Sequence, residues 1–202
     1  MSARTFGPVA IDAAEAMGGL GARLAALLGA GDVLVLTGRL GAGKTTLVRG
    51  LGEALGVRGT VSSPTFVIAR THPPLADGPA LIHVDAYRLD SALELDDLDL
   101  DLDTSVTVIE WGSEVVGAIA DSWLELVIER PRAAALEDAA EAVHPAGQVG
   151  ASGSARDDRG RGPADGVDAD LALDEPRTVT LRAVGPRWAE VRDEVLDALL
   201  AP

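Results

Sequence analysis

The chain has 202 residues, enough for one domain with a sizeable core, and a formal net charge of −15. It contains no cysteine, which excludes disulfide frameworks, thiolate metal sites and cysteine nucleophiles. No apolar run reaches the roughly 18 residues that a membrane helix needs. The first residues also lack a signal-peptide pattern, so we expect a cytoplasmic protein.

The negative charge is concentrated in two stretches of the chain. Residues 90–103 carry seven acids and no base, and residues 137–175 carry ten acids against three arginines. Affinity for phosphate backbones depends on clustered Lys and Arg, so we expect this chain to reach any nucleic acid through a partner. Among the 17 basic residues, Lys44 is the single lysine.

The first predicted elements are a helix, a short strand and a second helix. Asp12, with Glu15 three residues later, is typical of a helix N-cap with a capping box. The apolar run 33–36 predicts a buried strand. A second helix is expected over residues 45–55, and Gly56 is expected to end it.

Three glycines fall inside the first predicted helix, at Gly18, Gly19 and Gly21. They resemble part of a dinucleotide-binding fingerprint, but that fingerprint follows a strand, whereas these glycines precede one. We therefore interpret them as positions where another helix packs closely.

Further along the chain the pattern alternates between strands and loops. Strands are predicted over residues 66–71, 81–85, 106–111, 123–129 and 178–184. Leucines between residues 93 and 102 alternate with acids. After the last strand we expect one helix, with an apolar face made of Trp188, Val191, Val195 and Leu199. Strands interleaved with helices predict an α/β fold, with a central sheet flanked by helices.

Between residues 133 and 176 this periodicity is lost. The segment is rich in Ala, Gly, Asp and Pro and has little apolar surface to bury, so we expect it to be disordered. The predicted organisation is a single domain. Its core spans residues 1–132, the acidic insertion spans 133–176, and a strand and helix over 177–202 complete the core.

A phosphate-binding pattern follows the strand predicted at 33–36. The residues from Gly38 to Thr45 read Gly-Arg-Leu-Gly-Ala-Gly-Lys-Thr, which matches the P-loop (Walker A) pattern G-x-x-x-x-G-K-[ST]. In this pattern backbone N–H groups and the helix N-terminus hold phosphates, Lys44 reaches the β- and γ-phosphates, and the Thr45 hydroxyl ligates Mg²⁺. A glycine-rich turn that binds no ligand is the alternative.

We therefore expect a P-loop NTPase-like fold that holds ATP and Mg²⁺. The residues expected to contact nucleotide in the loop are Gly38, Leu40, Gly41, Ala42, Gly43, Lys44, Thr45 and Thr46.

Two strand-end acids are candidates for the chemistry beside the phosphates. Asp85 ends the strand predicted at 81–85, and Glu110 lies near the end of the strand predicted at 106–111. Either side chain could ligate Mg²⁺ or orient a water, or could cap the following turn. His83 alternates with Asp85, as a packing residue or as a hydrogen-bond partner of the site. The loop that contains Thr65 is a candidate γ-phosphate sensor, or an ordinary loop.

Four motifs occur in order along the chain: Gly41-Ala-Gly-Lys-Thr-Thr46, Ser63-Pro-Thr-Phe66, His83-Val-Asp-Ala-Tyr-Arg-Leu89 and Ile109-Glu-Trp111. Together they closely resemble the bacterial TsaE (YjeE) family over about residues 10–130. The resemblance implies a weak, Mg²⁺-dependent ATPase of tRNA threonylcarbamoyladenosine biosynthesis. Such an ATPase would act on the TsaB–TsaD complex, which modifies the adenosine next to the anticodon. Any contact with tRNA would be indirect, through that complex.

The resemblance also implies roles for individual residues. Thr45 and Glu110 would be Mg²⁺ ligands, and Asp85 would be a catalytic or metal-linked carboxylate. Thr65 would belong to a switch loop. The expected catalytic set is Lys44, Thr65, Asp85 and Glu110.

Two further expectations and two departures accompany the resemblance. Trp111 would belong to a functional turn, and the segment around Ile11 and Asp12 would touch the base or ribose. Arg39 stands where the family commonly has Asp, and the insertion over 133–176 is longer and more acidic than usual.

Two other functions share these motifs. A small-molecule P-loop kinase needs an arginine-rich lid, for which the arginines between 156 and 161 are the candidates. A nucleotide-gated assembly factor, in which hydrolysis is incidental, would use the same site residues.

Overall fold

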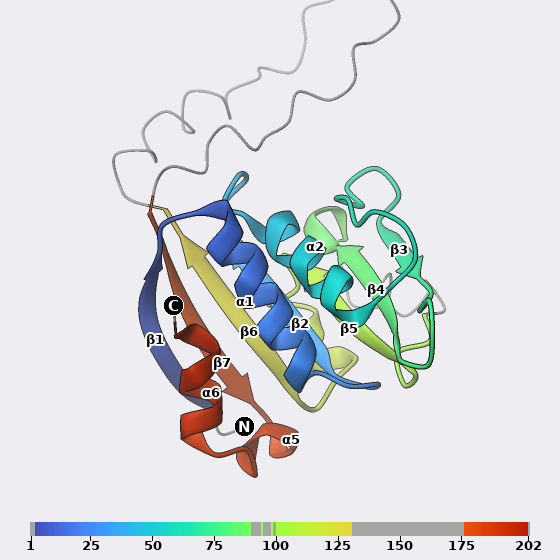
Figure 1. Ribbon diagram of the computed structural model, residues 1–202. Helices are drawn as coiled ribbons and strands as arrows, with labels where there is room; N and C mark the ends of the chain where they lie inside the picture. The colour runs from blue at the N-terminus through green and yellow to red at the C-terminus, as the bar shows by residue number, and fades with distance from the viewer. Residues whose placement is uncertain (1–2, 90–93, 95–97, 99, 131–175, 202) are drawn as a thin grey trace, which may run out of the picture.

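The computed structural model describes residues 3–89, 94, 98, 100–130 and 176–201 (Figure 1). Its centre is a seven-stranded sheet with the strand order β1-β7-β6-β2-β5-β4-β3. The strands are β1 (Ala3–Ile11), β2 (Val33–Gly38), β3 (Ala69–His72), β4 (Ala80–Asp85), β5 (Ser105–Glu110), β6 (Trp123–Glu129) and β7 (Arg177–Val184). The helices are α1 (Ala14–Leu27), α2 (Lys44–Leu55), α5 (Pro186–Ala189) and α6 (Asp193–Leu200), with short 3₁₀ turns η1 (Ala86–Arg88) and η2 (Val116–Ala118).

The four middle strands run parallel, and antiparallel strands close both edges. β2 pairs in parallel with β5 and with β6, and β4 pairs in parallel with β5. β7 and then β1 extend one side antiparallel, and β3 extends the other. This mixed sheet confirms the predicted α/β fold. Open α/β sheets bind ligands beyond the carboxyl ends of their parallel strands, and β2 leads at that edge into the predicted P-loop.

Alternating side chains of the four parallel strands contribute to two separate apolar clusters. Leu34 and Leu36 of β2 face α1 and α2, and this larger cluster extends to α6. Val33 and Val35 face the opposite side, where η2 contributes Val116. Leu98, Leu100 and Leu102, part of the leucine run noted in the sequence, pack against this second cluster. Figure 1 shows α1 and α2 side by side over one face of the sheet.

Helices α1 and α2 touch backbone to backbone. A Cβ placed on Gly21 would lie 2.1 Å from the carbonyl oxygen of Leu47, and one on Gly50 would lie 2.2 Å from that of Gly18. No side chain fits at that distance, so these two positions require glycine. The prediction that glycines in the first helix serve close packing is confirmed for this contact. It fixes α2, whose first residue is Lys44, against the rest of the domain.

The start of the chain differs from the prediction in two ways. Residues 3–11 form the edge strand β1, which the sequence analysis did not anticipate. Pro8 interrupts the apolar pattern there, and prolines are tolerated on edge strands; the β1–β7 register shifts between Phe6 and Val9. The predicted capping box is wrong. The N-cap of α1 is Ala13, in an extended conformation and without a side-chain cap, so Asp12 lies one residue outside the helix.

The strand predicted over 66–71 is shorter in the structure and begins at Ala69. The carbonyl of Pro64 accepts hydrogen bonds from the N–H groups of Val67 and Ile68, both at 2.8 Å, which closes a turn. Phe66 is 93% exposed. The β-favouring side chains at 66–68 therefore belong to a surface turn, because local hydrogen bonding outweighs their propensity.

The final helix is divided into two. Arg192 has an extended backbone between α5 and α6, and Asp193 and Glu194 occupy the first turn of the second helix. Acidic residues favour a helix N-terminus through the helix dipole, which explains the new start. Of the predicted apolar face, Trp188 and Leu199 are buried.

The predicted acidic insertion over 133–176 and the arginines at 156–161 fall almost wholly outside the described residues, so those interpretations stay predictions. Within the described ranges, no helix is both long and apolar enough to cross a bilayer.

Gly21→Ala should destabilise the domain by at least about 1–3 kcal/mol, because the new methyl group overlaps the Leu47 carbonyl and forces the helices apart. Chemical denaturation measures the change in the free energy of unfolding. Gly18→Ala is the matched control on the same helix, since a Cβ there has no atom within 4 Å. That control should be neutral or gain about 0.5–1 kcal/mol from helix propensity. Equal effects of the two substitutions would contradict the packing argument.

Candidate functional site

The P-loop connects the end of β2 to the start of α2. Gly41 and Gly43 have φ angles of 72° and 101°, in the left-handed region that favours glycine. Gly38 is favoured for a different reason, because a Cβ there would lie only 2.6 Å from the carbonyl oxygen of Ile128. The glycines therefore permit the tight turn that brings the loop under the N-terminus of α2, where backbone N–H groups and the helix dipole attract anions.

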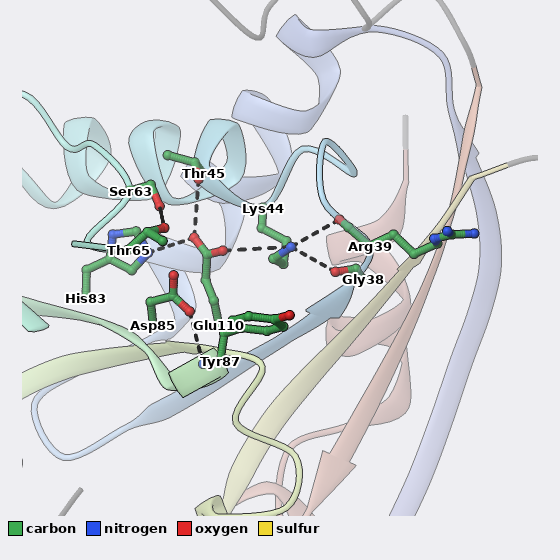
Figure 2. A network of polar contacts seen from close by, with 10 residues as sticks. All are labelled: Gly38, Arg39, Lys44, Thr45, Ser63, Thr65, His83, Asp85, Tyr87 and Glu110. Carbon is green, nitrogen blue, oxygen red and sulfur yellow. Dashed lines mark hydrogen bonds and ion pairs between the residues drawn. The ribbon is translucent and has the colours of Figure 1, made fainter. Parts of the chain in front are cut away.

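The amine of Lys44 is held on three sides. Nζ donates hydrogen bonds to the carbonyl oxygens of Gly38 at 2.8 Å and Arg39 at 3.2 Å, and it lies 3.8 Å from Oε2 of Glu110 (Figure 2). It also lies 4.3 Å from the ring centroid of Trp111, a cation–π contact. Lys44 is only 5% exposed. The single lysine of the chain is therefore a buried cation at the mouth of the P-loop.

Opposing effects act on the charge of this amine. Burial lowers the pKa of Lys44 from its ordinary value, whereas the negative charges of Glu110 and Asp85 raise it, and the net direction is downward. The two carboxylates therefore offset part of the cost of keeping an ammonium group at this buried position.

Glu110 is the point where the polar contacts meet. Its Oε1 accepts hydrogen bonds from the Thr45 hydroxyl at 3.3 Å and from Nε2 of His83 at 2.9 Å. Its Oε2 faces Lys44. Glu110, at the end of β5, is 4% exposed, and these contacts come from α2 and β4 (Figure 2). A buried carboxylate thus joins the P-loop lysine and threonine to the neighbouring strand.

Asp85 lies directly across from Glu110 in the β4–β5 register. Successive side chains of a strand point to opposite faces of the sheet. Leu81 belongs to the apolar cluster beneath α2, so Asp85, four residues further along β4, faces the same side. Oδ1 of Asp85 accepts a hydrogen bond from the N–H of Tyr87 at 3.1 Å. Asp85 therefore does cap the turn η1, as one of the two interpretations of the sequence expected, while its position beside Glu110 also suits the other.

Trp111 follows β5 with φ at 64°, a left-handed conformation that is rare for a bulky residue. Its N–H donates to the carbonyl of Leu36 at 2.9 Å, and its ring meets Tyr87 edge to face at 5.7 Å between centroids. The strained backbone turns the indole ring over Lys44. This agrees with the expected position of Trp111 in a turn beside Glu110.

The loop that carries Thr65 is tied to the turn after β4. The hydroxyls of Ser63 and Thr65 are 2.7 Å apart, and the Arg88 guanidinium donates to the Thr65 carbonyl. Thr65 itself makes no hydrogen bond to Glu110 among the described residues. Arg88 and Tyr87 belong to the motif His83–Leu89, but the sequence analysis assigned neither of them a role of its own. Their position directly after Asp85 was the available signal, because a short turn keeps its residues close to the strand end.

Two further predicted residues lie outside this network of contacts, and Arg39 joins it only through its backbone. Leu40, at the tip of the P-loop, is 84% exposed. Asp12 is exposed at the junction of β1 and α1. The side chain of Arg39 points away from Lys44 and Glu110 in Figure 2, so only its carbonyl takes part in the network.

The oxygen atoms at this site fit a small, hard cation. Among the described residues, no three His, Cys, Asp or Glu side chains form a metal-binding group. Mg²⁺ in phosphate sites takes one or two protein oxygens and completes its shell with phosphates and waters. The Thr45 hydroxyl and the Glu110 carboxylate, 3.3 Å apart, are a donor set of that kind.

A glycine-rich loop between a buried strand and a helix, with a buried lysine and a threonine at the helix start, defines a P-loop nucleotide-binding protein of the α/β class. The family described as "Threonylcarbamoyl adenosine biosynthesis protein TsaE" matches residues 11–137, which is more than half of the chain. The chain belongs to this family.

Individual relatives agree with this assignment. The "tRNA threonylcarbamoyladenosine biosynthesis protein TsaE" of Streptomyces coelicolor is 63% identical over 114 residues, which cover 55% of this chain and 77% of that protein. The protein of the same name from Mycobacterium tuberculosis is 48% identical over 120 residues, covering 55% of this chain and 71% of that protein. A crystal structure of Bacillus subtilis YdiB is similar in fold, with a TM-score of 0.59, 24% identity and coverage of 98% of this chain and 96% of that one.

Lys44→Ala and Lys44→Arg should both weaken nucleotide binding while the fold is retained. Charged hydrogen bonds contribute about 1.5–3 kcal/mol, so a loss of roughly 10- to 150-fold is expected. The arginine fork does not reproduce a point charge between the two loop carbonyls, so restoring positive charge alone should not rescue binding. Calorimetric titration with ATP measures the affinity, and Arg58→Ala, an exposed cation elsewhere, is the control. Wild-type affinity in either Lys44 variant would remove Lys44 from the site.

Proposed function

We propose that the protein is a Mg²⁺-dependent ATP-binding protein with weak ATPase activity that serves tRNA threonylcarbamoyladenosine biosynthesis. In this proposal it acts on the TsaB–TsaD complex during modification of the adenosine next to the anticodon. Membership of the TsaE family supports the pathway. The observation that carries the chemistry is the buried Glu110 carboxylate, which contacts both Thr45 and Lys44 of the P-loop.

The reaction is the transfer of the γ-phosphoryl group of ATP to water. A bond forms between the water oxygen and the γ-phosphorus, the bond from that phosphorus to the bridging oxygen of ADP breaks, and the water releases a proton. Lys44 and the loop N–H groups would bind the β- and γ-phosphates and stabilise the negative charge that develops on them. The loop contacts expected at Gly38 through Thr46 belong to the same proposal.

Thr45 and Glu110 would hold Mg²⁺, with Asp85 as a further carboxylate beside them. The bound ion would supply electrostatic stabilisation of the charge on the transferring phosphoryl group. Asp85 would orient a water at the edge of the site, because only its Oδ1 is engaged by the cap of η1. Thr65, on a loop held by Arg88, would respond to the γ-phosphate.

The acidity of the chain supports an indirect relation to tRNA. With a net charge of −15 the protein lacks the excess of cations that phosphate-backbone binding requires. Contact with tRNA through the partner complex is therefore part of the proposal.

A P-loop kinase and a nucleotide-gated assembly factor are the competing functions. The arginines at 156–161, which a kinase lid would need, lie outside the described residues, so no observed contact favours a kinase. An assembly factor would use the same nucleotide site. Threonylcarbamoylation by TsaB–TsaD over many turnovers, with ATP compared with a non-hydrolysable analogue, separates it from the proposal. Full activity with the analogue would favour the assembly factor.

The direct test measures phosphate release from ATP with and without the TsaB–TsaD complex. We expect slow release from the protein alone and faster release with the complex. Transfer of phosphate to a small molecule in place of release would favour the kinase. The absence of any ATP binding at millimolar Mg²⁺ would overturn the proposal.

Glu110→Gln should leave nucleotide binding measurable and slow hydrolysis by about 10²–10³-fold, because losing one stabilising contact at the transferring phosphoryl group costs about that much. Raising the Mg²⁺ concentration should partly restore turnover if Glu110 holds the ion. It should do little if Glu110 only orients a water. ATP turnover across a Mg²⁺ titration, in the presence of the partner complex, is the measurement.

Two variants accompany this experiment. Asp85→Asn, measured in the same Mg²⁺ titration, shows which of the two neighbouring acids determines the Mg²⁺ dependence of turnover. Glu125→Gln removes another buried carboxylate, which lies on β6 and contacts Thr37, Ser113 and Arg182 but not Lys44 or Thr45, so it should change stability but not the Mg²⁺ dependence. If Glu110→Gln turned over like wild type at low Mg²⁺, its assignment to the metal would be wrong.

A further inference from the structure

His83 is a buried histidine placed diagonally from Glu110. It lies on β4 opposite Val108 of β5, and Glu110 is two residues further along the same face of β5. Its side chain is 0% exposed, and its Nε2 lies 2.9 Å from Oε1 of Glu110. Burying a polar ring beneath α2 costs desolvation free energy that an aliphatic side chain would not. The hydrogen bond to Glu110 offsets that cost and indicates why a histidine occupies this position.

The contact with Glu110 defines which ring nitrogen must carry a hydrogen. A carboxylate oxygen only accepts, so Nε2 must donate its hydrogen to Glu110. Nδ1 is also buried, and no described residue forms a hydrogen bond with it. The contact with Glu110 thus places a hydrogen on Nε2 of His83.

The contact from His83 is the shortest that the Glu110 carboxylate makes. The Thr45 hydroxyl is 3.3 Å from the same oxygen, and Lys44 Nζ, at 3.8 Å from Oε2, is beyond hydrogen-bond distance. Lys44 instead donates to two loop carbonyls. With Oε1 anchored by His83, the carboxylate keeps its second oxygen in an ion pair with Lys44 at 3.8 Å, a separation too long for a hydrogen bond between them.

We propose that His83 is a positioning residue that fixes the orientation of the Glu110 carboxylate, so that Glu110 can hold Mg²⁺ while Lys44 remains available to phosphate. This inference rests on the proposed function, because it needs Glu110 to act at the metal. Without the Nε2 donor, the carboxylate is free to rotate toward Lys44, and a direct hydrogen bond between the two would withdraw both groups from the ligand.

Two substitutions separate the hydrogen bond from the volume of the ring. His83→Gln places an amide N–H at about the reach of Nε2 and keeps a donor, while His83→Met keeps a long side chain without one. The readout is binding: calorimetric titration with a non-hydrolysable ATP analogue, repeated across a series of Mg²⁺ concentrations. No turnover is needed.

His83→Met should raise the Mg²⁺ concentration for half-maximal binding by about 10- to 100-fold, the usual cost of losing a group that orients a ligand. His83→Gln should recover most of that loss. In the Glu110→Gln background, His83→Met should have little further effect, because its action passes through Glu110. An unchanged Mg²⁺ requirement in His83→Met, or an equal effect with and without Glu110, would overturn the inference.

His72 provides the matched control. It is another buried histidine, on β3, and its Nδ1 contacts the Arg58 carbonyl at 3.3 Å and not the site. His72→Met should alter stability without altering the Mg²⁺ requirement. If wild-type protein bound the analogue with no dependence on Mg²⁺, the proposed function would fail. If wild type depended on Mg²⁺ and His83→Met matched it, only the role of His83 would fail.

A measurement on the wild-type chain covers the case in which the His83 variants do not fold. The chain has three histidines, so the ¹⁵N imidazole resonances can be assigned with His72→Gln and His144→Gln, each of which removes the signals of one ring. We expect the resonances of a ring that carries a hydrogen on Nε2, and a shift of Nε2 when Mg²⁺ and the analogue are added together. An Nε2 without a hydrogen, or an Nε2 unaffected by the ligands, would contradict the inference.

Discussion

Holding an ammonium group in a buried position is the constraint on which the site depends. Lys44 is almost fully buried, and its charge is compensated by two loop carbonyls, by the ring of Trp111 and by the nearby carboxylates of Glu110 and Asp85. These groups come from three segments of the chain. The P-loop, the end of β4 and the turn after β5 must therefore converge for the amine to remain charged, and their convergence builds the phosphate site.

The fold supplies this convergence through rigid packing. The sheet aligns the ends of β2, β4 and β5 at one edge, and the glycine contact fixes α2 against α1 with no side chain between them. The strained backbone of Trp111 costs free energy that the surrounding pairing must outweigh. Strain of this kind persists where it positions a side chain, and here it places the indole over Lys44.

The central elements and the main site residues could be predicted from the sequence, because periodicity and glycine placement are local signals. The strands at β4 to β7 and the phosphate loop were found in this way. The edge strand β1 was missed because Pro8 breaks the alternation, and the turn at 66–68 was taken for a strand because β propensity does not reveal a local hydrogen bond to Pro64. The meeting of His83 with Glu110 depends on the register of two strands distant in sequence, which no local pattern encodes.

The presence of a single lysine has a spectroscopic consequence. In a chain with 16 arginines and one lysine, the only ε-amine lies at the nucleotide site. Isotopic labelling of lysine would therefore give one side-chain amine signal, and that signal would report on the phosphate loop alone. Binding and the state of the carboxylates around the amine can be followed from a single resonance, without introducing a probe into the molecule.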